Sequence, residues 1–222
     1  MNYEQDFSKH APANVVPRLR MVWNSIPAQL AKENKKFIYG ILREGARAKD
    51  FEIALQWLVD CGLCHKVTRV TKGALPLKAY CDWASFKLYM ADVGLMCAMA
   101  DVDVKTILDG NRIFTEFKGA LTEQYVCQQL ISDNRLTPYY WSASNSAGEV
   151  DFIVQLSGKV IPVEVKAEEN LKARSLKSFL AKYGLEDSFR ISMSDYREQE
   201  QMINLPLYAV SMMGQVMEQG QG

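Results

Sequence analysis

The segment 148–167, GEVDFIVQLSGKVIPVEVKA, constrains the fold of this chain more than any other. Two runs rich in Val and Ile flank Ser157 and Gly158, a pair suited to a two-residue turn, and this pattern predicts a β-hairpin. With a loop of two residues, Asp151 on the first strand lies directly opposite Glu164 on the second. The hairpin therefore places two carboxylates side by side.

Side chains alternate between the two faces of a strand, so the hairpin has two chemically different faces. The apolar face, which we expect to lie on the core, shows Val150, Phe152, Val154, Ile161, Val163 and Val165. The charged face shows Glu149, Asp151, Ile153, Pro162, Glu164 and Lys166, with Glu149 opposite Lys166. A functional site is expected on the charged face.

Two carboxylates opposite each other repel and weaken a sheet, so Asp151 and Glu164 need something that offsets the repulsion. A divalent cation does this, because Mg²⁺ is held in proteins by one or two carboxylates together with waters and phosphate oxygens. Lys166, two residues from Glu164 on the same face, could orient a water or steady the charge on a scissile phosphate. The alternative is a solvated face whose charges pair across the strands.

A helix is predicted upstream of the hairpin at 114–131, FTEFKGALTEQYVCQQLI. At helical spacing, Glu123 falls on one line with Ala120, Cys127 and Leu130, among apolar neighbours. A carboxylate in such surroundings requires a partner. The alternative is a Glu at the edge of the apolar stripe that reaches water.

Glu123, Asp151 and Glu164-x-Lys166, in this order, resemble the core of the PD-(D/E)XK nucleases, which have the restriction-endonuclease-like fold. The resemblance implies that Mg²⁺, or Mn²⁺ in its place, lies between Asp151 and Glu164, with the Val165 carbonyl as a further ligand. It also implies that Glu123 completes the site and that Lys166 assists the attacking water. Phosphodiester hydrolysis in DNA is the reaction expected from it.

The surrounding sequence resembles the C-terminal region of bacterial and archaeal AAA-type ATPases, which carry a helical domain of unknown function ending in a nuclease-like unit. The resemblance is carried by FKGALTEQYV, YYWSASNSAGEVDFIV, VIPVEVKAEENLKARSLKSF and NLPLYAV, and upstream by VWNSIPAQLAKENKKFIYGILREGARAKDFEIALQWLVDCGL and FKLYMADVGLM. That family begins with a P-loop ATPase module, but this sequence has no G-x-x-x-x-G-K-[ST] motif. We expect that the chain is not an ATPase by itself and that a separate P-loop ATPase module is its partner.

The predicted fold class is α+β, with a helical N-terminal domain followed by an α/β/α domain around a mixed sheet. Helices at 26–33, 35–45 and 49–61 and a hairpin-like pair at 63–80 form a winged-helix pattern, and residues 86–110 read as helical. A helix at 175–183 and strands at 189–193 and 207–210 complete the second domain. The expected domains are an N-terminal extension (1–16), a winged-helix-like domain (17–80), a helical connector (81–110), a restriction-endonuclease-like domain (111–213) and a disordered tail (214–222).

Local clusters of basic residues suit DNA, although the whole chain, with 26 basic and 26 acidic residues, has no net charge. The candidate DNA-binding residues are Lys35, Lys36, Arg43, Arg47 and Lys49 in the first domain and Lys172 and Arg174 in the second. The alternative is a solvated surface on a domain that packs against an ATPase or a neighbouring domain. A non-catalytic docking or regulatory module is accordingly the second function we consider.

The five cysteines are odd in number and scattered, which fits reduced thiols in a cytoplasmic protein. No apolar run could span a membrane, and the N-terminus lacks a signal-peptide core, so no membrane partner is expected. Cys61-Gly-Leu-Cys64-His65 has the form of a c-type haem attachment site, and it also resembles half a zinc site or a redox pair. A helix that stops at Gly62 and is followed by a strand explains the same residues.

Overall fold

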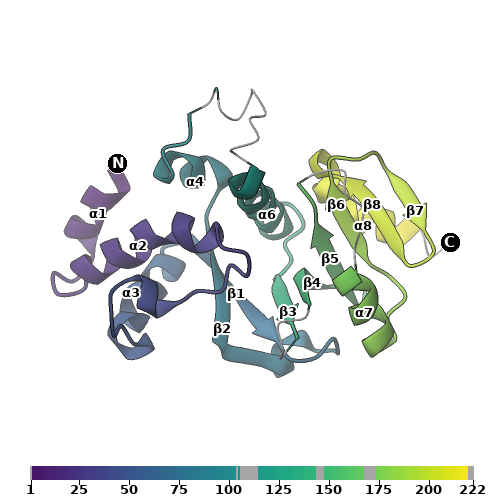
Figure 1. Cartoon of the computed structure of the whole chain (residues 1–222), viewed down its shortest axis with the longest axis horizontal. Coiled ribbons are helices and arrows are strands. Elements are labelled where there is room, and N and C mark those ends of the chain that lie inside the picture. Colours follow the sequence, from purple (N-terminus) through teal and green to yellow (C-terminus); the bar gives the residue numbers. More distant parts are fainter. Residues whose placement is uncertain (1, 104, 106–114, 144–147, 168–173, 220–222) are drawn as a thin grey trace. The chain divides into compact units, whose positions relative to one another are not determined.

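The computed structural model describes residues 2–103, 105, 115–143, 148–167 and 174–219, in two compact units (Figure 1). Unit 1 comprises Met1–Lys66 and Lys87–Asn111, and unit 2 comprises Val67–Phe86 and Arg112–Gly222. Helices come first and a large mixed sheet follows, so the predicted α+β class is confirmed. Among the described residues, no helix is both long enough and apolar enough to cross a bilayer.

Unit 1 is built from helices packed through aromatic side chains. In the described part of the unit the helices are α1 (Asn2–His10), α2 (Val16–Leu30), the 3-10 turn η1 (Tyr39–Ile41), α3 (Ala48–Asp60) and α4 (Val93–Met99). The ring of Phe7 meets Trp23 edge-on at 5.4 Å and Trp57 edge-on at 5.6 Å, and this joins α1 to α2 and α3. Edge-to-face pairs of this kind add to the hydrophobic burial of the rings.

Two of the three helices predicted for this region differ from the observed ones. The helix expected at 26–33 is the end of α2, which contains Pro27. The prediction of a helix at 35–45 is wrong, because only the three residues of η1 are helical in this segment. Lys35 and Gly45, with φ of +49° and +71°, adopt left-handed conformations that interrupt a right-handed helix. The third helix is α3, whose buried side chains include Phe51 and Leu55 as predicted.

The Cys61–His65 segment forms the turn that the helix-stop interpretation predicts. α3 ends at Asp60, Gly62 has a φ of +69°, and strand β1 (Cys64–Val70) begins two residues later. A left-handed glycine after the last helical turn is a common way to end a helix. The geometry of this segment is thus explained without a bound group.

Eight strands of the described residues form one mixed sheet in the order β2-β1-β3-β4-β5-β6-β8-β7 (Figure 1). After β1 these are β2 (Cys81–Met90), β3 (Tyr139–Ser142), β4 (Glu149–Leu156), β5 (Lys159–Val165), β6 (Phe189–Ser192), β7 (Arg197–Gln199) and β8 (Met202–Pro206). The prediction of a helix over 86–90 is wrong, because this segment is part of β2. The second strand expected in the hairpin-like pair at 63–80 is also wrong, because the 3-10 turn η2 (Leu77–Tyr80) lies there. Residues 85–90 are all buried, and a short run buried on both faces has no periodicity that separates strand from helix.

The predicted hairpin is confirmed as β4 and β5, with the predicted register. The backbone ladder runs from Phe152 opposite Val163 to Leu156 opposite Lys159. Ser157 and Gly158 have φ of +50° and +75°, as a type I′ turn requires at both central positions. The turn chemistry therefore fixes the register that brings Asp151 near Glu164.

The predicted division of this hairpin into an apolar core face and a charged face with Ile153 is wrong at β4. Ile153 is fully buried, and it forms a core cluster with Val150, Val160 and residues of helix α7 (Arg174–Tyr183). Against β3, the register of β4 shifts by one residue between Val150 and Ile153, and this irregularity turns both side chains to the same side. Phe152 on the opposite face is also fully buried, so both faces of β4 are covered.

The C-terminal part of unit 2 contains both confirmed and wrong predictions. α7 buries Leu176, Phe179 and Leu180, as its amphipathic pattern predicts. The strand expected at 207–210 is the 3-10 helix η4 (Leu207–Met212), and β8 lies just before it. The tail expected from residue 214 is instead helix α8 (Met213–Gln219). Its Met217 side chain is buried, which ties the helix to the unit.

Candidate functional site

Asp151 lies on β4 beside the end of β5. Its Oδ2 accepts a hydrogen bond of 2.8 Å from the backbone N–H of Val165. A carboxylate that accepts a backbone N–H makes a charge-assisted bond, so the side chain contributes to the order of the strand end. Asp151 thus has a structural contact in addition to any role in a site.

Glu164 and Lys166 form an ion pair at the end of β5. The Lys166 Nζ lies 2.5 Å from Glu164 Oε1, and the Glu164 side chain is 7% exposed while that of Lys166 is 32% exposed. Arg190 on β6 is the direct strand partner of Glu164 in the parallel ladder. The buried Glu164 carboxylate therefore pairs with Lys166, and its charge also favours the charged form of Arg190.

Glu123 lies on helix α6 (Thr115–Ser132) and is buried, as the sequence predicts. Helix α6 contacts β5, the strand that ends at the ion pair. Burial lowers the pKa of Lys166, but the carboxylates of Glu164, Asp151 and Glu123 raise it, and the net shift is upward. The four residues of the predicted catalytic set thus lie on neighbouring elements of unit 2, and all three carboxylates favour the charged form of Lys166.

The charge and donor chemistry of this set fit a hard divalent cation. Carboxylate oxygens and a backbone carbonyl, which Asp151, Glu164 and Val165 offer, are the ligands that Mg²⁺ prefers. In the described part of the chain, however, no three His, Cys, Asp or Glu side chains are arranged as a ready metal site. A cation would have to replace the ammonium of Lys166 at Glu164.

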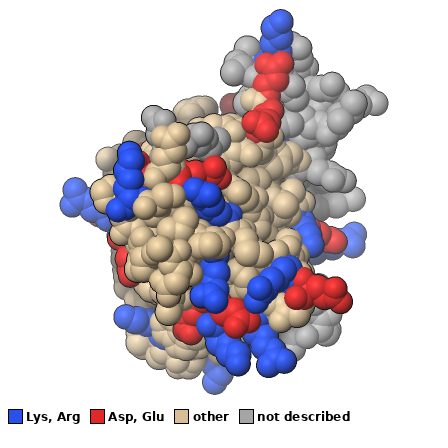
Figure 2. Space-filling model, turned by 90° about the vertical axis from the view of Figure 1, so that its left-hand side faces the viewer, with Lys and Arg blue, Asp and Glu red and all other residues tan. Residues whose placement is uncertain are grey.

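The predicted DNA-binding residues of unit 1 lie mostly on its surface. Lys36, Arg43, Arg47 and Lys49 are exposed and Lys35 is half-buried. Figure 2, which views one face of the molecule, shows Lys and Arg interspersed with Asp and Glu and separated by uncharged areas. In unit 2, Arg174 is exposed at the start of α7, and Lys172 lies outside the described residues.

Sequence reasoning missed two buried polar residues beside the set, Arg190 and Asn204. Both are almost fully buried, with 2% and 1% of their surface exposed. The Nε of Arg190 donates to the Oδ1 of Asn204 at 2.9 Å, across the parallel pair β6 and β8. The signal in the sequence is a charged residue inside a short apolar strand, which requires a partner that only the fold identifies.

Comparisons with known families place two domains of unknown function on this chain. Residues 2–106 match a family described as Domain of unknown function (DUF8612). Residues 118–209 match Domain of unknown function (DUF4143), a domain commonly found in ATPase-associated proteins. The second match covers all four residues of the candidate set.

No curated protein matches the chain. Among solved structures, the crystal structure of protein VC1899 from Vibrio cholerae aligns with 98% of this chain and 54% of its own, at 12% identity and a TM-score of 0.29. The chain thus spans about half the length of that structure. A likeness at this level carries no argument about function.

Proposed function

We propose that unit 2 is a restriction-endonuclease-like domain that hydrolyses phosphodiester bonds in DNA with Mg²⁺ or Mn²⁺. The observation that carries the proposal is that Asp151 and the Glu164–Lys166 ion pair meet at the end of β5, and that the helix bearing the buried Glu123 packs on this strand. These residues come from a helix and two adjacent strands, in the order in which they occur in PD-(D/E)XK nucleases.

In this proposal Asp151, Glu164 and the Val165 carbonyl hold the cation. When bound, the ion supplies positive charge that stabilises the negative charge developing on the phosphate. The cation would take the place of the Lys166 ammonium at Glu164 and leave this side chain free to turn to the substrate. Lys166 would then orient the attacking water and steady the phosphate, and the Glu123 carboxylate would accept the proton of that water.

Calorimetric titration of Mg²⁺ and Mn²⁺ tests the cation site. The informative variant is Asp151→Asn, because the amide oxygen still accepts the Val165 N–H while the negative charge is removed. Glu149→Gln is the matched control, since it removes one carboxylate from the same strand outside the set. We expect binding to the wild type and to Glu149→Gln and a loss of binding in Asp151→Asn. Equal affinities in all three proteins would contradict the proposal.

The second candidate is a non-catalytic docking or regulatory module for a P-loop ATPase or DNA, combining the helical unit 1 with a nuclease-like unit 2. The specific observation in its favour is the ion pair between Glu164 and Lys166, which takes up a carboxylate that a cation requires. DNA binding in EDTA, weakened by Arg43→Gln and Arg47→Gln together, would support this function.

A further inference from the structure

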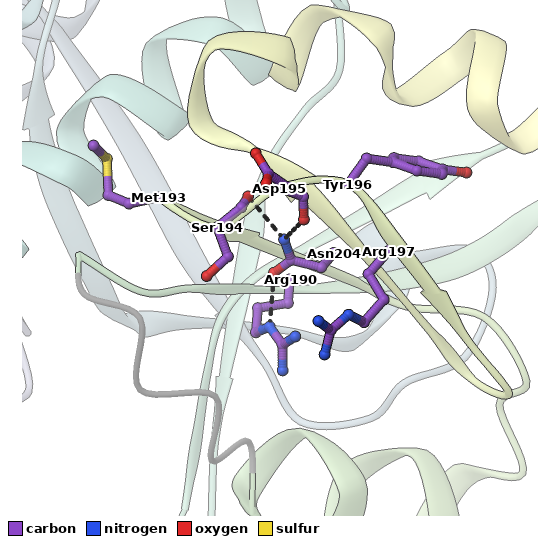
Figure 3. A pocket seen from close by; sticks show the side chains of 7 residues that line it. All are labelled: Arg190, Met193, Ser194, Asp195, Tyr196, Arg197 and Asn204. Carbon is purple, nitrogen blue, oxygen red and sulfur yellow. Dashed lines mark hydrogen bonds between the residues drawn. The ribbon is translucent and has the colours of Figure 1, made fainter.

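A pocket of about 460 Å³ lies where β6, β7 and β8 meet (Figure 3). Its volume falls within the range of small-molecule sites, roughly 300–1,000 Å³. Seven residues line it: Arg190, Met193, Ser194, Asp195, Tyr196, Arg197 and Asn204. None of them belongs to the set around Lys166.

Two arginines from different strands share one end of this pocket. Arg190 comes from β6 and is almost fully buried, whereas Arg197 comes from β7 and is exposed. Figure 3 shows both guanidinium groups at the same end, below Asn204. Their proximity also appears in the pKa of Arg190, which burial lowers and the charge of Arg197 lowers further, against an opposing effect of Glu164. Two like charges in one pocket favour an anion between them.

Asn204 holds this end of the pocket in a fixed geometry. Its Oδ1 accepts from the Nε of Arg190 at 2.9 Å and from the Ser192 hydroxyl at 2.8 Å. Its Nδ2 donates to the backbone carbonyls of Ser194 at 3.1 Å and Asp195 at 2.7 Å. The amide therefore orients the guanidinium plane of Arg190 and the turn between β6 and β7 together. A preorganised guanidinium loses less freedom when it binds an oxyanion.

The charge of the lining favours an anion as well. Arg190 and Arg197 carry positive charge, and Asp195 is the acidic side chain among the seven. The phenol of Tyr196 donates to the Glu198 carboxylate, so its hydroxyl is directed to β7. The lining thus has one excess positive charge, concentrated where the two guanidinium groups lie.

We propose that this pocket binds the phosphate group of a phosphate ester between the guanidinium groups of Arg190 and Arg197. Guanidinium groups present paired N–H donors that match two oxygens of a phosphate, and two arginines balance the charge of a monoester. The volume exceeds that of a phosphate and leaves room for the organic group attached to it. This site requires no cation and no residue of the Lys166 set, so it goes beyond the proposed nuclease function.

Binding of three probes in EDTA tests the proposal: inorganic phosphate, a nucleoside 5′-monophosphate and a 5′-phosphorylated oligonucleotide. Affinity is measured by calorimetry on the wild type and on Arg197→Gln, Arg197→Lys and Lys159→Gln. Arg197 lies on an exposed edge strand, so its variants are expected to fold, which circular dichroism checks. Lys159, an exposed cation at the hairpin turn paired with Asp187, controls for the loss of one charge.

We expect Arg197→Gln to weaken binding of the phosphorylated probes at least tenfold, Arg197→Lys to weaken it less, and Lys159→Gln to leave it unchanged. Tighter binding of the oligonucleotide than of the nucleotide would identify nucleic acid as the source of the phosphate, and the reverse order a free nucleotide. Absence of phosphate binding to the wild type, or an equal loss in Lys159→Gln, would overturn the proposal. Since EDTA removes divalent cations, failure here leaves the nuclease proposal intact.

Discussion

Replacing Lys166 with Met should destabilise the protein more than replacing its partner Glu164 with Gln. Lys166→Met keeps the apolar stem of the side chain but leaves the buried Glu164 carboxylate without the ammonium that lies 2.5 Å away. It also removes the positive charge that offsets Asp151 and Glu123. Glu164→Gln instead removes one of three mutually repelling carboxylates, and Lys166 keeps the other two as neighbours.

The burial of the pair sets the magnitude. Removing one partner of a fully buried ion pair costs about 3–5 kcal/mol, because the other charge stays buried. The Lys166 side chain is 32% exposed, so water compensates part of the loss. We therefore expect a cost of about 2 kcal/mol for Lys166→Met and at most about 1 kcal/mol for Glu164→Gln.

Thermal unfolding followed by circular dichroism at pH 7 in EDTA measures the difference. At roughly 2–4 °C per kcal/mol for a chain of this size, Lys166→Met should lower Tm by about 4–8 °C. Mg²⁺ should restore part of this loss if the three carboxylates can hold a cation. Equal effects of the two substitutions, or an unchanged Tm in Lys166→Met, would refute the view that Lys166 neutralises the carboxylates.

Three further predictions concern stability. Val163→Asp places a charge at a fully buried position and should unfold unit 2, at a cost above about 4 kcal/mol. Its control, Ser157→Asp, lies in the exposed turn and should be tolerated. Chemical denaturation of the two variants measures the difference in unfolding free energy. In Gly73→Ala the new Cβ would lie 2.7 Å from the Cζ of Phe179, and this overpacking should cost about 1–3 kcal/mol of stability. Gly119→Ala in α6 has open space around the new Cβ and should be neutral or stabilising. An unchanged Tm in Gly73→Ala would contradict this packing. The pKa of Lys166 in the folded protein is raised above 10.5, so the stability that its charge contributes is complete below the unfolded pKa and is lost as pH rises through the folded pKa. The difference in stability between wild type and Lys166→Met should therefore be constant from pH 7 to 9 and should shrink above about pH 10.5. A difference that grows above that pH would contradict the predicted sign.

The parts of the site that could be predicted from the sequence are those fixed by local patterns. The Ser157-Gly158 turn sets the hairpin register, and this register brings Asp151 and Glu164 together. The helical line through Glu123 correctly predicts its burial, because apolar neighbours at three- and four-residue spacing face the core. Local turn chemistry and periodicity suffice for these features.

The parts that could not be predicted depend on contacts between distant segments. The second face of the hairpin is buried because α7, which follows in sequence, packs on Ile153. The bond between Arg190 and Asn204 forms only when β6 and β8 lie side by side, with β7 between them in sequence but at the edge of the sheet. Phe86 to Met90 has no alternation, since both faces of this strand end are buried.

Cleavage of DNA tests the central claim, that Glu123, Asp151, Glu164 and Lys166 form a cation-dependent hydrolytic site, most directly. Wild type, Asp151→Asn and the control Glu149→Gln are incubated with labelled single- and double-stranded DNA in Mg²⁺, Mn²⁺ or EDTA. The account predicts cleavage by the wild type and the control with either metal, and none in EDTA or with Asp151→Asn. Intact DNA under all conditions, or equal cleavage by Asp151→Asn, would contradict it.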